Sequence, residues 1–119
     1  MGTKTRKQVA FDLDTKQLQK YYPTNTWTNA YLVIGNHMKE NDFKWIQGSV
    51  YESNEELNTY DVNKILTTLI LENPWLHKCM RDCRQSDIGE QHSLNQIFDR
   101  TKDIPEREIQ KSKDRALSL

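Results

Sequence analysis

The first apolar pattern in the chain is a strict alternation. Across residues 8–14, apolar side chains alternate with small or polar ones. The apolar members are Val9, Phe11 and Leu13. Because side chains two positions apart on a strand share a face, the pattern predicts a β-strand whose opposite face carries Ala10, Asp12 and Asp14.

A helical spacing follows this strand. Any helix begun after Thr15 ends by Pro23, because the residue before a proline is pushed out of the helical region. Apolar residues then recur every three or four positions. These residues are Trp27, Ala30, Tyr31, Ile34 and Met38. We predict a helix here, with Thr26 as a candidate cap and Asn41-Asp42 as its end.

Two further segments have the composition of strands. Residues 43–51 are rich in aromatic and β-branched side chains, and Gly48-Ser49 interrupts them in the middle. This pattern predicts two strands joined by a turn, or one bent strand. Residues 79–88 are predicted to form the last strand of the domain.

A second helix is predicted between these strands. Ser53 and Glu56 have the spacing of a capping box, in which each side chain satisfies a backbone N–H at a helix start. An apolar stripe follows, made of Leu57, Val62, Ile65, Leu66, Leu69 and Ile70. The helix is expected to run to about Asn73, where Pro74 ends it.

The resulting order, β-α-β-β-α-β, predicts an α+β fold. Two helices on one face of an antiparallel sheet form a ferredoxin-like sandwich. We expect residues 1–7 to be an N-terminal extension, residues 8–98 the ferredoxin-like domain, and residues 99–119 a charged C-terminal tail or helix. One sheet face stays uncovered in this architecture. Together with a surplus of aromatic residues (Trp27, Trp45, Trp75 and Tyr51), it predicts a homodimer.

Composition narrows the functional classes. At 119 residues one domain is expected, and 17 Lys and Arg balance 17 Asp and Glu, so no global basic field draws the protein to nucleic acid. Cys79 and Cys83 form neither a disulfide framework nor a four-ligand zinc site, which favours a reducing cytoplasm. No apolar stretch approaches the roughly 18 residues of a membrane span, so no membrane partner is expected.

The carboxylates of Asp12 and Asp14 are the first candidate chemistry. A carboxylate pair at a strand end suits a metal or a phosphate-ester reaction, whereas the simpler interpretation is a solvated strand end with Asp14 starting a turn. Phosphatases of the haloacid dehalogenase class share an Asp-x-Asp motif, but they need a Thr at the position of Lys16. They also need alternating βα units that this chain lacks. We therefore reject the phosphatase interpretation.

The other polar candidates are histidines and a basic cluster. His37, His77 and His92 have no metal-ligand spacing. On a regular strand Arg81 and Arg84 point to opposite faces, while Asp82 shares the face of Arg84 and can pair with it. The cluster is therefore either a surface ion pair or, if an arginine lies near the first aspartate, a phosphate-binding site.

Several segments together resemble the virulence-associated protein D family of bacteria. They are Val9-Ala10-Phe11-Asp12-Leu13-Asp14-Thr15, Tyr22-Pro23, Asn29-Ala30-Tyr31, Phe43-Lys44-Trp45, Gln47-Gly48-Ser49-Val50-Tyr51, Pro74-Trp75 and Arg81-Asp82-Cys83-Arg84. The resemblance covers residues 8–88. It implies a fold similar to the small ferredoxin-like CRISPR-associated adaptation protein, a homodimer, and an endoribonuclease that acts on RNA, often as the toxin of a toxin–antitoxin pair with a small antitoxin protein.

The resemblance also implies site residues. The strand-one aspartate of the family falls on Asp12, the catalytic candidate. Two copies of it facing each other across a dimer axis would repel unless a shared proton or a cation such as Mg²⁺ lay between them, so Asp12 is also the metal candidate. Supporting candidates for phosphate or base contact are Asp14, Gln47, Ser49, Tyr51, Arg81 and Arg84. The alternative is a non-catalytic ferredoxin-like dimer that binds nucleic acid or a protein partner.

Overall fold

The computed structural model describes residues 3–105, 107 and 110. The chain divides into two compact units, Met1–Gly89 and Glu90–Leu119. The first unit contains the sheet and the helices that pack on it.

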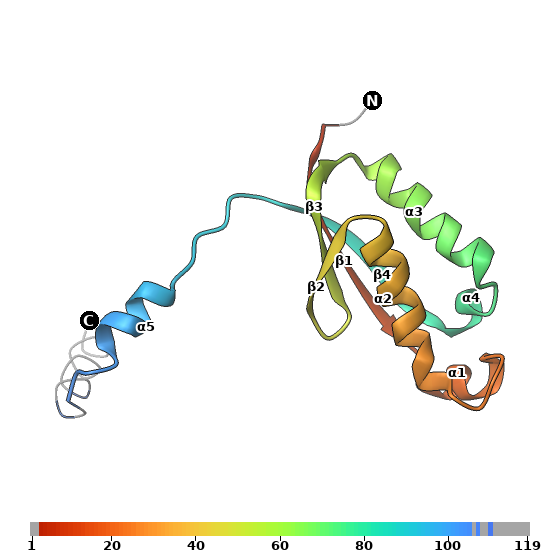
Figure 1. Cartoon of the computed structure of the whole chain (residues 1–119), viewed down its shortest axis with the longest axis horizontal. Helices are drawn as coiled ribbons and strands as arrows, with labels where there is room; N and C mark the ends of the chain where they lie inside the picture. The colour runs from red at the N-terminus through yellow and green to blue at the C-terminus, as the bar shows by residue number, and fades with distance from the viewer. Residues whose placement is uncertain (1–2, 106, 108–109, 111–119) are drawn as a thin grey trace. The chain divides into compact units, whose positions relative to one another are not determined.

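Four antiparallel strands form the sheet of the first unit (Figure 1). They are β1 (Thr5–Leu13), β2 (Phe43–Gln47), β3 (Val50–Leu57) and β4 (Met80–Ile88), in the order β2-β3-β1-β4. The two central strands, β3 and β1, are therefore not connected directly in sequence. This α+β arrangement is compatible with the predicted ferredoxin-like fold.

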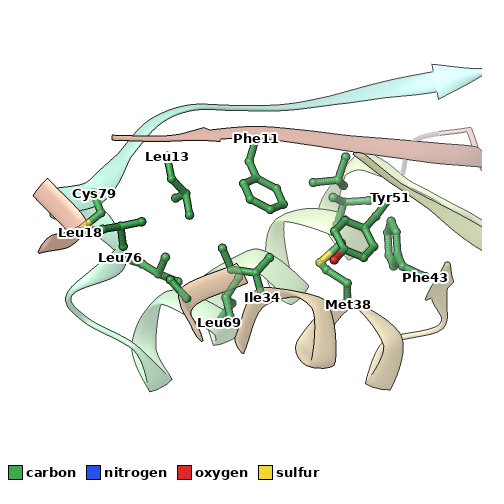
Figure 2. Close-up of a cluster of buried hydrophobic side chains, with 13 residues drawn as sticks. Phe11, Leu13, Leu18, Ile34, Met38, Phe43, Tyr51, Leu69, Leu76 and Cys79 are labelled. Carbon is green, nitrogen blue, oxygen red and sulfur yellow. The ribbon is translucent and has the colours of Figure 1, made fainter. Parts of the chain in front are cut away.

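Two long helices cover one face of the sheet. They are α2 (Ala30–Glu40) and α3 (Thr59–Glu72), and Figure 2 shows their ribbons on one side of β1 with core side chains between. Shorter helices complete the layer: α1 (Thr15–Tyr21), the 3-10 turn η1 (Trp27–Asn29) and α4 (Leu76–Cys79). Within the part of the chain that the structure describes, no helix is long and apolar enough to cross a membrane.

The alternation predicted for β1 is confirmed. Val9, Phe11 and Leu13 are buried under the helices, whereas Asp12 is exposed on the opposite face. The Phe11 ring stacks on Tyr51 of β3, with centroids 6.3 Å apart (Figure 2). Burial of such side chains, at about 1.5–3 kcal/mol each, is the main force that holds the helices to the sheet.

Predicted turns and helix ends are also found. Gly48-Ser49 joins β2 to β3, and Gly48 has a φ of 47°, a conformation that glycine adopts without steric cost. Helix α2 ends at the predicted position, because Asn41 is its C-cap and Asp42 has a φ of 64°. Thr26 precedes the 3-10 turn rather than the α-helix, and its side chain makes no cap hydrogen bond.

The predicted start of the second helix is wrong. Ser53 and Glu56 lie within β3, and the capping box is formed instead by Asn58 and Asp61 at the start of α3. The hydroxyl of Ser53 has another use, because it accepts a hydrogen bond from the backbone N–H of Lys7 at 2.8 Å. This bond gives the Lys7 N–H a partner at the point where the register between β1 and β3 shifts.

The sheet begins earlier than the sequence indicates. Residues 5–7, expected in an N-terminal extension, belong to β1 and pair with β3 and β4. The sequence pattern does not reveal this part of the strand because its side chains are polar: Lys7 interrupts the apolar alternation, although it is buried. Its ammonium pairs with the carboxylate of Asp87 on β4.

Most of the aromatic surplus is absorbed by the fold. Tyr51 lies in the core, and Trp27 and Trp75 pack against it. Trp75 also meets the Tyr22 ring edge-on at 4.8 Å. Only Trp45 of the four aromatic residues remains largely exposed, at 57%.

The second unit contains helix α5 (Asn95–Thr101). Its apolar side chains Ile97 and Phe98 are exposed. The helix begins before residue 99, where the charged tail or helix was predicted to start. Most of that predicted tail, residues 106, 108–109 and 111–119, lies outside the described residues.

Candidate active site

Asp14 has left the strand and starts helix α1. Its Oδ1 accepts hydrogen bonds from the backbone N–H groups of Lys16 and Gln17, at 3.0 and 3.2 Å. Its own N–H donates to the carbonyl of Cys79 at 2.8 Å, which fixes it beside β4. The bond from Gln17 and the nearby Arg81 charge hold the pKa of Asp14 below its usual value. Asp14 is therefore an anionic N-cap, as the turn interpretation predicted.

Asp12 lies just before this cap, on the sheet face away from the helices. Its side chain is 58% exposed, and its strand is central in the sheet. Asp82 of β4 is its paired residue across the strands. Substrate can therefore reach Asp12 from solvent, while a central strand fixes its backbone.

Arg81 joins the two aspartates. Its Nη1 lies 3.7 Å from Asp12 Oδ2, and its Nη2 lies 3.5 Å from Asp14 Oδ2. The register shifts at this point, so that Asp82 pairs with Asp12 but Met80 pairs with Leu13. Arg81 is the additional residue of this β-bulge, and bulges are known to redirect side chains next to active sites. The regular strand assumed from the sequence does not hold here.

Asp82 and Arg84 form the ion pair predicted from their spacing. Arg84 Nε donates to Asp82 Oδ2 at 2.8 Å, and both side chains are exposed. Arg84 pairs in register with Ala10, two residues before Asp12. It therefore lies on the same sheet face as Asp12, as a second guanidinium near the carboxylates.

The remaining site candidates lie at different distances from Asp12. The carbonyl of Ser49 accepts a hydrogen bond from Phe11 N at 3.1 Å, so the β2–β3 turn lies beside the residue preceding Asp12. Gln47 is exposed at the end of β2 next to that turn. Tyr51 is buried in the core, where burial raises the pKa of its phenol. The structure thus brings Asp14, Arg81 and Ser49 near Asp12 and places Tyr51 apart.

Two histidines of the first unit bond to backbone carbonyls rather than to this cluster. His37 contacts the Ile65 carbonyl at 2.8 Å between α2 and α3, and His77 contacts the Pro74 carbonyl at 2.6 Å. Cys79 and Cys83 are free thiols, the first buried and the second exposed. Loss of hydration raises the pKa of both, and the nearby charges of Asp14 and Asp82 add to the effect at Cys79 and Cys83 respectively. Within the described residues no three His, Cys, Asp or Glu side chains are grouped to hold a metal ion.

The arrangement suits chemistry on a phosphate ester. A guanidinium binds phosphate oxygens through forked hydrogen bonds, and it stabilises the charge that develops at phosphorus. A neighbouring carboxylate can accept a proton from an attacking hydroxyl. The sequence identified Asp12, Asp14 and Arg81 as candidates. It did not predict the β-bulge that brings Arg81 to both aspartates, because no periodic pattern indicates an inserted residue.

The fold and this cluster define a class, the small α+β proteins with an exposed, arginine-paired aspartate on a central strand. No family model matches the chain. Endoribonuclease VapD 2 of Riemerella anatipestifer is 34% identical over 86 residues, which are 72% of this chain and 92% of that protein. Endoribonuclease VapD of Dichelobacter nodosus is 40% identical over 76 residues, 64% of this chain and 78% of that protein.

A third relative extends the comparison. The endoribonuclease VapD homolog of Helicobacter pylori is 33% identical over 86 residues, 72% of this chain and 88% of that protein. These relatives are matched over most of their own length. The chain belongs to the VapD endoribonuclease family.

Proposed function

We propose that this protein is an endoribonuclease whose active site is built on Asp12 and Arg81. The observation that carries the proposal is the Arg81 guanidinium, held within 4 Å of both Asp12 and Asp14 on an exposed sheet face. The names of the three relatives supply the substrate class, RNA. The geometry supplies residues able to act on its phosphodiester bonds.

Each residue has a distinct task in this proposal. Arg81 binds the non-bridging oxygens of the scissile phosphate and stabilises their growing charge. Asp12 accepts the proton of the attacking oxygen, which is either the neighbouring 2′-hydroxyl or a water molecule. The bond from phosphorus to the leaving oxygen then breaks. This is the 5′-oxygen when the 2′-hydroxyl attacks, and the 5′- or the 3′-oxygen when water attacks, and the leaving oxygen takes a proton from solvent. Asp14 keeps the guanidinium in place.

A divalent cation is a further part of the proposal. Mg²⁺ commonly binds proteins through one or two carboxylates and keeps several water and phosphate ligands. Asp12, exposed and beside Asp82, suits such a site, in which the ion would help neutralise the phosphate. Activity measured with Mg²⁺ and after chelation tests this part separately.

The central test compares the parent protein with Asp12→Asn on a labelled RNA. We expect the variant to cleave slower by two or more orders of magnitude, the range that loss of a general base produces, roughly 10²–10⁴. The matched control is Glu55→Gln, which neutralises an exposed carboxylate on a different strand, β3, and is expected to cleave normally. Equal cleavage by Asp12→Asn and parent would remove Asp12 from the mechanism.

The chemical ends of the product separate the two nucleophiles. A 2′,3′-cyclic phosphate identifies attack by the 2′-hydroxyl, and a 3′-hydroxyl with a 5′-phosphate, or a 3′-phosphate without any cyclic precursor, identifies water. If the parent binds RNA without cutting it at any metal concentration, the protein is instead the non-catalytic binding dimer considered as the alternative.

We also propose a homodimer. Its support is the sheet face opposite the helices, where the side chains of Asp12 and Arg84 are 58% and 77% exposed. Two protomers paired through this face would bring two copies of the site together. Solution mass at micromolar concentration tests this, and a monomer would remove the shared-aspartate arrangement.

The biological setting we propose is that of a bacterial toxin. An endoribonuclease acting on cellular RNA in the cytoplasm needs restraint, which a small antitoxin protein would provide. We expect expression of the parent to arrest bacterial growth and Asp12→Asn not to. Growth arrest by both proteins would show that RNA cleavage is not its cause.

A further inference from the structure

Trp45 lies in an open hollow between strand β2 and helix α2. The hollow has a volume of about 250 Å³. Its lining residues are Tyr31, Leu32, Gly35, Asn36, Lys39, Trp45 and Tyr51. Two of its aromatic side chains reach solvent, since Trp45 is 57% and Tyr31 37% exposed. Large aromatic groups exposed together on a small domain commonly mark a binding surface.

The indole of Trp45 is held in one orientation. Its Nε1 donates a hydrogen bond to the carbonyl of Gly48 at 3.0 Å, which uses the only polar atom of the ring. The ring face thus stays free while its edge is anchored. A pre-oriented aromatic face is a stacking platform, and it loses little side-chain entropy when a planar ligand binds.

The polar groups of the hollow favour an anionic ligand. None of its lining residues is acidic. Lys39 is exposed, and among residues 3–105 no ion pair engages its ammonium. Asn36 adds an amide, which can both donate and accept hydrogen bonds. An aromatic face beside an unpaired cation and an amide matches a nucleobase with its phosphate.

The hollow is connected to the candidate active site by the β2–β3 turn. Trp45 bonds to Gly48, and the next residue, Ser49, accepts the bond from Phe11, which precedes Asp12. From strand spacing and rise, the Trp45 and Asp12 backbones lie roughly 14 Å apart. Trp45 pairs through Tyr51 with Val9 and so faces the helices, whereas Asp12 lies on the opposite face. A base at Trp45 therefore belongs to another nucleotide than the one that is cut, and the RNA between them bends round the sheet at this turn.

We propose that this hollow binds an unpaired base of single-stranded RNA that passes over the Gly48-Ser49 turn to reach Asp12. The inference rests on the proposed function, because it names the form of RNA used by the same site. A base can stack on the indole only when it is not stacked and paired within a duplex. Gln47 is exposed beside the turn, where the RNA would pass.

The test is a binding measurement on the full chain carrying Asp12→Asn, with a fluorescein-labelled single-stranded RNA and a matched duplex. We expect Trp45→Ala to weaken binding of the single strand roughly tenfold or more, as loss of one stacked base does. Trp45→Phe, which keeps an aromatic face, is expected to retain most of the affinity. Tyr60→Ala removes an aromatic side chain of similar exposure on α3 and is the matched control, expected to bind normally.

The inference would be overturned by unchanged binding of Trp45→Ala, by an equal loss in Tyr60→Ala, or by equal binding of duplex. A change in solution mass with Trp45→Ala would also overturn it, since the surface would then join copies of the chain. Cleavage by the parent is scored separately. If the parent cuts RNA and Trp45→Ala binds normally, only this inference fails, and if the parent neither binds nor cuts, the proposed function fails with it.

Discussion

Lys7 is a buried cation whose counter-charge lies in solvent on the neighbouring strand. Its side chain is 3% exposed, whereas that of its partner, Asp87, is 66% exposed. The hydrogen bond from Lys7, with a second from Thr5, lowers the pKa of Asp87. The two partners of this ion pair are thus unequal, because only one of them loses its hydration on folding.

This inequality predicts opposite outcomes for the two single variants. Asp87→Asn leaves a buried ammonium without a counter-charge and should clearly lower the melting temperature at pH 7. Lys7→Met fills the same space with an apolar chain and leaves Asp87 in water, so it should be close to neutral. Thermal melts of both variants provide the measurement, and a larger loss in Lys7→Met would refute the reasoning.

The same ion pair predicts that the free energy of unfolding decreases at acid pH. A carboxylate whose folded pKa is depressed contributes stability that is complete above its unfolded pKa, near 3.8, and is lost as pH falls through the folded value. Stability should therefore decrease below about pH 4. Denaturant melts between pH 2 and 7 should show a smaller decrease for Asp87→Asn than for the parent protein.

Arg81 provides a test of the catalytic geometry that does not change the aspartates. Arg81→Ala should reduce the rate of RNA cleavage by about 10²-fold or more, because the transition-state charge loses its donor. Arg81→Lys keeps a positive charge but lacks the planar guanidinium, so its cleavage rate should lie between those of the parent protein and Arg81→Ala. Single-turnover rates are the measurement, and a lysine variant as active as the parent would show that charge alone suffices.

Gly35 is packed against the hydroxyl of Tyr51. A Cβ built on Gly35 would lie 2.8 Å from that oxygen, closer than side chains normally approach. We expect Gly35→Ala to destabilise the fold by about 1–3 kcal/mol through overpacking. Tyr51→Phe removes the oxygen and should restore part of the loss in the double variant. Additive effects of the two changes in urea melts would contradict this contact.

Ser53 satisfies two backbone groups in the middle of the sheet. It is 1% exposed, accepts from Lys7 N and donates to the Glu55 carbonyl at 2.7 Å. Ser53→Ala should cost about 1–3 kcal/mol, because a buried N–H loses its partner. Ser53→Thr, which keeps the hydroxyl, is the control, and urea melts of the two variants should separate them.

The sequence predicted the elements whose apolar pattern is clear. The alternation of Val9, Phe11 and Leu13 defined β1, and Gly48-Ser49 marked the hairpin turn correctly. The second half of β3 was not predicted as a strand, because its residues, from Glu52 to Glu56, are polar on both faces. There the pairing with β1 decides the structure, and a local capping-box motif predicted a helix start that tertiary contacts override.

The candidate site shows the same division. Spacing left open whether Asp12 and Asp14 belong to one site, and in the structure both carboxylates lie near the Arg81 guanidinium. The route to that result differs, because Asp14 is a helix cap rather than a strand residue. Arg81 reaches both acids through a bulge, whose position depends on how β4 is registered against β1. Register of this kind arises from the assembled sheet and not from any local pattern.

The two oxygens of the Asp14 carboxylate work independently. Oδ1 holds the first turn of α1 through Lys16 and Gln17, and Oδ2 faces Arg81. The guanidinium can therefore bind an incoming phosphate without disturbing the Oδ1 hydrogen bonds that cap the helix. Exchange of ligands at this arginine leaves the helix start intact, so we expect the Gln17 amide to exchange its hydrogen at the same rate with and without bound RNA.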